Sequence, residues 1–349
     1  MTSDAQHDDA HRSSKRDSFV SAKADITNRE SIICGGISGL TSRFFVAPLD
    51  VVKIRQQLQT TSFKRQDGAV RGINTVPGPM YRGMMSSIIK IYKDEGITAL
   101  WKGNVPAELL YLLYGSIQFT TFHQSNVLIN EYASEYMLPG LQQFITGAVS
   151  GAAATIATYP LDLLRTRFAV QGNNSQRVYR SLRHSILQIY ADEGFAGFFR
   201  GLRPAVSQIV PYMGIFFVSY ASLQSLISTM SKDNNNINAF GSDDAIAGMV
   251  AGTISKTAVF PLDVIRKRLQ VQGPTLNQYV LRDIPMYPKN IFGCAKAIFV
   301  TEGIRGLYKG LWVSLVKAAP ASAITMWTFE NSVRALRWYD TQMESFQAS

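Results

Sequence analysis

The chain has 349 residues, of which 46% are hydrophobic, and its 35 basic and 25 acidic residues give a formal net charge of +10. This length allows two soluble domains or one membrane bundle, and the charge admits nucleic acid, a membrane surface or a small anion as partner. Two cysteines are too few for a disulfide framework, and four histidines give no metal-ligand set, so no cofactor or metal is expected.

The first segment, residues 1–29, mixes both signs of charge with serine and lacks an apolar stretch. It predicts a disordered N-terminal tail without a signal peptide. The last residues, 339–349, are expected to form a C-terminal tail.

Three sequence elements recur in the same order three times. A Pro-Leu-Asp-x-x-basic-x-basic motif begins at Pro48, Pro160 and Pro261. Each copy follows a pair of glycines and precedes a Glu-Gly and an aromatic-basic-Gly element. Such self-similarity indicates repeats, which we place at residues 30–129, 138–228 and 241–338. An insert at residues 60–80 occurs only in the first repeat.

Each repeat carries two long apolar stretches. The first stretches cover about residues 31–58, 141–169 and 243–271, and the second stretches about 104–129, 202–227 and 311–335. All six approach or exceed the ~20 residues that span a bilayer. The linkers between them alternate between basic and acidic, as the positive-inside rule predicts for successive crossings. We therefore expect an all-α membrane protein with six transmembrane helices, because a soluble nucleic-acid binder has no reason for this alternation.

In this pattern the sequence resembles the mitochondrial carrier family over about residues 30–338. The resemblance implies three pseudo-threefold repeats, short matrix helices and a place in the mitochondrial inner membrane as a multi-pass transporter working by alternating access. It implies no binding of nucleic acid. An enzyme is disfavoured, since no nucleophile–base pair or phosphate-cradling glycine loop appears. We expect a monomer.

The repeated motif places an acid and a base on one helix face, three residues apart, and the prolines are expected to kink their helices. By the resemblance, these charges form a matrix gate in which each acid pairs with the base of the next repeat: Asp50 with Arg165, Asp162 with Arg266, and Asp263 with Lys53. Ion pairs in a watery vestibule are worth ~1 kcal/mol each. Gln57 and Gln270 match the family's bracing glutamine, whereas the second repeat has Ala169 there.

The aromatic-basic-Gly elements open the second helix of each repeat. A helix N-terminus beside a basic residue can bind phosphate, and the resemblance implies cardiolipin there. The alternative is that the basic side chains only reach the membrane interface. The residues concerned are Lys102, Gly103, Arg200, Gly201, Lys309 and Gly310.

The family's second gate, at the far ends of these helices, is mostly missing. The corresponding residues read FHQSN (122–126), YASLQ (220–224) and FENSV (329–333), in which only Glu330 is charged. We expect a weak or polar gate on the cytoplasmic side.

Polar residues inside the spans predict the substrate site. Arg43 and Lys256 lie seven residues before their gate acids, with Thr155 at the matching place in the second repeat. The family's contact points fall on the second helix of each repeat. The expected substrate-binding residues are Arg43, Leu110, Tyr111, Gln208, Ile209, Lys256 and Lys317.

Three cations suit a substrate with several negative charges, such as a pyrophosphate. The runs 101–119, 200–217 and 315–330 look most like those of thiamine pyrophosphate carriers, fungal ones in particular. We expect import into the matrix in exchange for nucleotides, with Tyr111, Tyr212 or Trp327 stacking on the substrate's rings. Glu108 either meets a cationic part of the substrate or faces a neighbouring helix. A carrier of adenine nucleotides or coenzyme A is the alternative.

Overall fold

The computed structural model describes residues 28–60, 80–81, 83–132, 139–172, 178–233, 242–281 and 284–347. Most of the expected N-terminal tail (residues 1–27) and of the insert (residues 61–79) lies outside these ranges. The described residues are mainly helical and contain one isolated β-bridge, between Gln171 and Tyr279.

The first helix of each repeat runs through its proline without ending there. These helices are α2 (Asn28–Leu58), α5 (Pro139–Val170) and α9 (Ser242–Gln270), with Pro48, Pro160 and Pro261 inside them. An interior proline removes one backbone hydrogen bond, but the remaining turns keep the helix continuous. Each motif's acid and base therefore project from the last turns of one unbroken helix.

The second helix of each repeat differs between repeats. In the first repeat it is the single helix α4 (Asn104–Tyr132). In the others it is divided, into α7 (Leu202–Ser207) and α8 (Ile209–Asp233), and into α11 (Leu311–Val316) and α12 (Ala318–Gln347). The expected C-terminal tail is thus helical as far as residue 347.

Prolines account for the two divisions. Pro211 and Pro320 have no backbone N–H to donate to the carbonyls four residues earlier, at Ser207 and Val316, where α7 and α11 end. The first repeat has Leu113 at the equivalent place, and α4 continues. The single residues at the divisions are Gln208 and Lys317, both expected substrate contacts.

Short helices join the two long helices of each repeat. They are α3 (Met84–Glu95) with the 3-10 helix η1 (Ile97–Trp101), α6 (Leu182–Glu193) with η3 (Phe195–Phe199), and, after η4 (Leu276–Gln278), α10 (Ile291–Leu307). They pack against the ends of α2, α5 and α9 and bury the apolar core, which includes Leu58, Tyr179 and Ile298.

Three stretches of the described chain are long and apolar enough to cross a membrane: Gly140–Val170, Phe195–Ile227 and Ala245–Gln270. The helices α2, α4 and α12 have similar lengths of 31, 29 and 30 residues.

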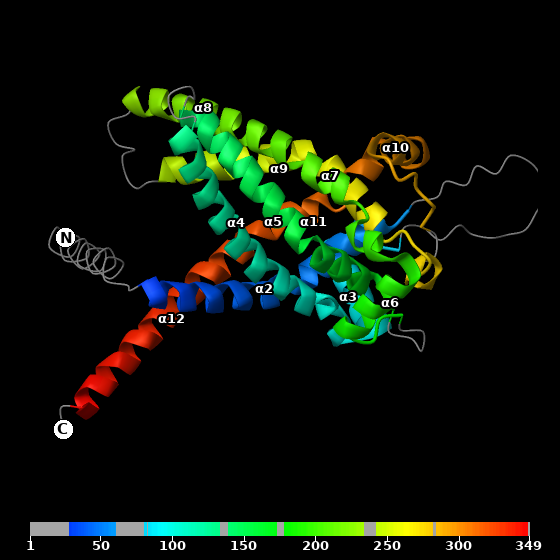
Figure 1. The fold of residues 1–349 in the computed structure, drawn as a ribbon, viewed down its shortest axis with the longest axis horizontal. Coiled ribbons are helices and arrows are strands. Elements are labelled where there is room, and N and C mark those ends of the chain that lie inside the picture. The colour runs from blue at the N-terminus through cyan, green and yellow to red at the C-terminus, as the bar shows by residue number, and fades with distance from the viewer. Residues whose placement is uncertain are drawn as a thin grey trace, which may run out of the picture. The chain divides into compact units, whose positions relative to one another are not determined.

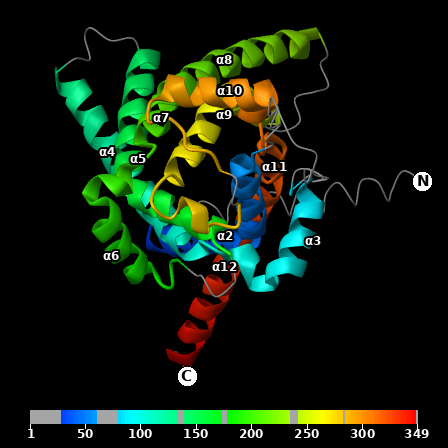
Figure 2. The same cartoon turned by 90° about the vertical axis from the view of Figure 1, so that its right-hand side faces the viewer.

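The chain divides into two compact units, one of residues 1–45 and 319–349 and one of residues 46–318. In the first, the Ser42 hydroxyl donates a hydrogen bond of 2.9 Å to the Ala321 carbonyl, so α2 contacts α12. In the second, α4 lies along α5 and α8 along α9 (Figures 1 and 2). The second helix of one repeat therefore packs on the first helix of the next.

Candidate functional site

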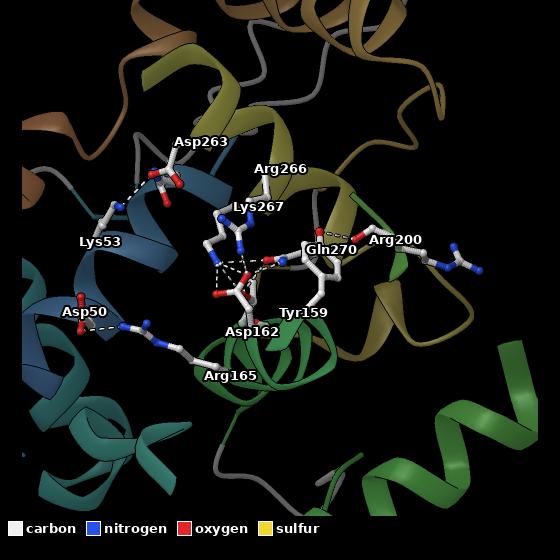
Figure 3. Close-up of polar contacts among 12 residues, drawn as sticks. Asp50, Lys53, Tyr159, Asp162, Arg165, Arg200, Asp263, Arg266, Lys267 and Gln270 are labelled. Carbon is white, nitrogen blue, oxygen red and sulfur yellow. Dashed lines mark hydrogen bonds and ion pairs between the residues drawn. The ribbon is translucent and has the colours of Figure 1, made fainter. Parts of the chain in front are cut away.

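Six charged side chains from the three repeated motifs meet at the ends of α2, α5 and α9. We call this set, which comprises Asp50, Lys53, Asp162, Arg165, Asp263 and Arg266, the charge ring. Each acid pairs with the base of the next repeat, as the resemblance implied (Figure 3). The nitrogen–oxygen distances are 2.6 Å for Arg165–Asp50, 2.8 Å for Arg266–Asp162 and 2.7 Å for Lys53–Asp263.

The ring is more buried than the sequence suggested. Asp50 and Asp162 are each 6% exposed, so these pairs do not lie in a watery vestibule. Removing one partner of a buried pair costs about 3–5 kcal/mol, several times the ~1 kcal/mol of an exposed pair. Separating one of these pairs therefore requires new partners for both of its charges.

In two of the three pairs, a glutamine side chain donates a hydrogen bond to the aspartate. Gln57 Nε2 donates to Asp263 Oδ2 at 3.0 Å, and Gln270 Nε2 donates to Asp162 Oδ2 at 2.5 Å. Ala169 cannot hydrogen-bond through its side chain, so the Asp50–Arg165 pair has no such brace.

Lys267 also joins the ring, which the sequence analysis missed. Its ammonium lies 3.0 Å from both oxygens of Asp162 and donates to Thr166 Oγ1 and Gln270 Oε1 at the same distance (Figure 3). The signal was the run of three basic residues at 266–268, unique to the third repeat. The motif spacing identifies Arg266 as the base of the third repeat, but it assigns no role to Lys267.

Aromatic rings lie against all three bases. The guanidinium of Arg266 lies 5.3 Å from the centre of the Tyr159 ring, and the Lys53 ammonium 5.6 Å from that of Phe260. Both aromatics directly precede a motif proline. Ala47 holds that place in the first repeat, and Arg165 lies instead 5.6 Å from the ring of Tyr111, on α4.

Tyr111 and Lys317 supply the support that the Asp50–Arg165 pair lacks from the motifs. Arg165 Nη1 donates to the Tyr111 hydroxyl at 3.1 Å. The Lys317 ammonium forms an ion pair with the other oxygen of Asp50. Two expected substrate contacts are therefore bound to the charge ring in this structure.

A cavity of about 480 Å³ lies against the charge ring, within the 300–1,000 Å³ typical of small-molecule sites. Its wall includes four basic residues, two acidic residues and several aromatic side chains. The expected contacts Leu110, Tyr111, Gln208, Ile209 and Lys256 line it, as does Thr155. Arg43 and the exposed Trp327 belong to the other unit, and their part in the site stays a prediction.

Lys256 is the cation best placed to receive a ligand. It lines the cavity two turns from Asp263, and it forms no hydrogen bond or ion pair with any residue that the structure describes. The charges of Lys53 and Lys317 are close enough to repel it. An anion entering the cavity would relieve this repulsion.

A second cavity, of about 520 Å³, shares Gln118 and Met213 with the first. Phe122, Asn126 and Gln143 also line it, and its wall contains no charged residue. The polar gate at the places of the family's second gate stays a prediction.

Glu108 makes a local contact with its own helix. Asn104 Nδ2 donates to Glu108 Oε1 at 3.1 Å. This hydrogen bond gives one carboxylate oxygen of Glu108 a partner. A contact between Glu108 and a substrate stays a prediction.

A second threefold set, also missed from the sequence, lies at the short helices. The last arginine of each motif is fully buried and pairs with the glutamate of the Glu-Gly element of its own repeat: Arg55 with Glu95, Arg167 with Glu193, and Arg268 with Glu302. The arginines also donate to backbone carbonyls at the end of the next repeat's first helix, at Ala169, Gln270 and Gln57. The available signal was that each repeat carries both an arginine at the end of its first motif and a glutamate in its Glu-Gly element.

The basic residues expected to bind lipid take part in this set. Lys102, Arg200 and Lys309 pair with the same three glutamates, and each donates to a carbonyl of the next repeat. They hold neighbouring repeats together in this structure. Burial would raise the pKa of Glu95, but Arg55 and Lys102 hold it below its ordinary value, and Arg268 and Lys309 do the same for the pKa of Glu302.

Comparison with known proteins gives consistent results. The family model described as "Mitochondrial carrier protein" matches residues 25–133, 137–231 and 240–340. The chain is 51% identical over 318 residues to the "Mitochondrial thiamine pyrophosphate carrier 1" of Emericella nidulans, covering 91% of this chain and 95% of that protein. A protein of the same name from Neosartorya fischeri is 52% identical over 314 residues, covering 90% and 95% of the two chains. One from Pyricularia oryzae is 50% identical over 311 residues, covering 87% and 92%.

Proposed function

The chain belongs to the mitochondrial carrier family, and from this premise we propose that it carries thiamine pyrophosphate into the mitochondrial matrix. It is a multi-pass protein of the inner membrane and a transporter. Its relatives that are 50–52% identical bear the name of thiamine pyrophosphate carrier.

The cavity wall supports this substrate through Lys256. This lysine faces the cavity without an ion pair among the described residues, and Lys53, Arg165 and Arg266 lie on the same wall. The excess of positive charge suits a pyrophosphate. The rings of Tyr111, Tyr114 and Tyr212 also line the cavity and offer faces for the cationic thiazolium and the aminopyrimidine.

Alternating access follows from the position of the charge ring. The ring borders the cavity, and we propose that its closed pairs form the gate on the matrix side. Substrate phosphates offer the ring's bases new anionic partners, so binding lowers the cost of opening. We propose nucleotides as the counter-substrate, because their phosphates fit the same cations.

Uptake by the purified protein in liposomes tests the proposal. Labelled thiamine pyrophosphate should enter liposomes preloaded with nucleotide, and unlabelled ADP or coenzyme A should compete more weakly than unlabelled thiamine pyrophosphate. Lys256→Gln should reduce uptake at least tenfold, whereas Lys296→Gln, on the exposed face of α10, should leave it unchanged. Stronger competition by ADP or coenzyme A would instead assign the chain to the alternative substrates.

We also propose that cardiolipin binds where the second helices begin, after Gly103, Gly201 and Gly310, and that the protein acts as a monomer. Backbone N–H groups at these helix starts can receive a phosphate while the neighbouring basic side chains keep their glutamate partners. Cardiolipin should raise the Tm of the detergent-solubilised protein more than phosphatidylcholine does. Native mass spectrometry should show one chain per particle.

A further inference from the structure

The three pairs of the charge ring are alike in sequence but not in what supports them. Asp162–Arg266 is held by Gln270, Lys267 and Tyr159, and Lys53–Asp263 by Gln57 and Phe260. All five supports lie on α2, α5 or α9, the helices that also carry the pairs. Figure 3 shows Gln270, Lys267 and Tyr159 beside the Asp162–Arg266 pair.

The Asp50–Arg165 pair takes its supports from elsewhere. Ala169 and Ala47 occupy the places where the other pairs have a glutamine or an aromatic ring. Tyr111, which lines the cavity from α4, accepts a hydrogen bond from Arg165 and faces its guanidinium. Lys317, at the division between α11 and α12, binds Asp50.

From this asymmetry we infer that Lys317 and Tyr111 form a clasp on the Asp50–Arg165 pair that the substrate's anionic end releases, so that the ring opens at this pair first. The inference rests on the proposed function, since it assigns the coupling between substrate and gate to two side chains. Among the described residues, no side chain from the second helix of a repeat supports the other two pairs. These two pairs open afterwards.

The electrostatics of the cavity favour this release. The Lys317 side chain keeps 16% of its surface exposed, and its charge is near enough to Lys256 to repel it. A pyrophosphate bound at Lys256 would attract both Lys256 and Lys317. It would therefore compete with the Asp50 carboxylate for the Lys317 ammonium. Asp50 then keeps only Arg165, and that pair loses its second cation.

The helix division gives Lys317 room to move. Pro320 cannot donate to the Val316 carbonyl, so the backbone beside Lys317 lacks a hydrogen bond that a regular helix would have. Tyr111 acts in the same direction, because a substrate ring stacked on it competes with the guanidinium of Arg165.

The cost of releasing the clasp must appear in the substrate affinity. Where a site is competent only after an internal contact breaks, the apparent affinity falls by the competent fraction. Asp50→Asn removes the charge that holds Lys317 and should therefore tighten binding of thiamine pyrophosphate about three- to tenfold, as measured by titration calorimetry of the detergent-solubilised protein.

Asp162→Asn is the matched control. Asp162 is as buried as Asp50 and also pairs with two cations, but both of these come from α9. Asp162 lines the cavity itself, so its replacement also removes a negative charge beside the substrate. The effects of Asp162→Asn and Lys317→Gln on the affinity should therefore add, whereas adding Lys317→Gln to Asp50→Asn should abolish the gain of Asp50→Asn. The clasp is refuted if Lys317→Gln couples equally to both variants.

A second measurement decides the matter if the Asn variants do not fold. Lys317→Met should lower the Tm of the substrate-free protein by about 2–4 °C, because Asp50 loses a cation, and Lys256→Met should not lower it. Both variants should lose the Tm increase that thiamine pyrophosphate produces. Equal substrate-free Tm values would overturn the clasp.

Failure of the proposed function gives a different result. If the wild type binds ADP but not thiamine pyrophosphate, the substrate assignment is wrong, and the same variants titrated with ADP still test the clasp.

Discussion

Gly103 packs so closely against Arg165 that a β-carbon on Gly103 would lie 2.6 Å from the Arg165 carbonyl oxygen. Gly201 and Gly310 stand in the same relation to Arg266 and Lys53, with distances of 3.0 and 3.2 Å to their carbonyl oxygens. Each second helix thus begins against the backbone of a ring base from the next repeat. A movement of one repeat therefore displaces the backbone of a charge-ring residue in the next repeat.

These three glycines form a graded test of that packing. All three have φ between +80° and +82°, so alanine adds similar backbone strain at each, of order 1–3 kcal/mol. Close contact adds to this strain, and Gly103→Ala should lower Tm most and Gly310→Ala least. Gly140→Ala, with nothing near its β-carbon, is the control. Equal losses at the three sites would show that strain alone matters.

The two glutamine braces should differ in strength. Gln270 donates to Asp162 while its oxygen accepts from Thr166 at 2.7 Å and from Lys267 at 3.0 Å. Gln57 donates to Asp263, but its buried oxygen has no hydrogen-bond partner among the residues that the structure describes. Since a hydrogen bond contributes about 0.5–1.5 kcal/mol net and the Gln270 side chain makes more of them, Gln270→Ala should lower the substrate-free Tm more than Gln57→Ala does. Thermal unfolding of both variants in one detergent measures the difference, and the opposite order would contradict this account.

The buried Arg167–Glu193 pair should be essential for stability. The two side chains are 0% and 1% exposed and lie 2.6 Å apart. Glu193→Gln leaves the guanidinium buried without an anion, which costs about 3–5 kcal/mol. Expression and Tm should fall sharply, whereas Asp192→Asn, at the exposed neighbour, should have little effect. A stable Glu193→Gln protein would mean that the carbonyl contacts of Arg167 suffice.

Stability should fall in acid through Glu95 and Glu302. Basic partners hold the pKa of both carboxyls below the ordinary value in the folded protein, despite burial, which acts the other way. Their contribution is therefore complete above the unfolded-state pKa of about 4.3 and is lost as pH falls below it. Tm recorded against pH should drop below about pH 4.5. In Glu95→Gln the drop should be smaller, and an unchanged acid profile would exclude Glu95 as a cause.

The sequence by itself determined the repeats, the positions of the long helices and the residues able to form the charge ring. These features depend on offsets along single helices: residues three apart share a face, and seven residues make two turns. The acid–base partners and the two glutamine positions came from the family resemblance, and the structure brings those residues together.

Only the tertiary structure decided which ring pair is supported by Tyr111 and Lys317. Lys317 and Asp50 are 267 residues apart, and Arg165 and Tyr111 are 54 apart, so no periodicity relates them. Their contacts depend on which helices pack side by side and on how far a long side chain reaches from a helix divided by proline. Lys267 and the buried Arg–Glu pairs escaped sequence reasoning for the same reason, because neighbouring basic residues differ in partner only once the helices are in place.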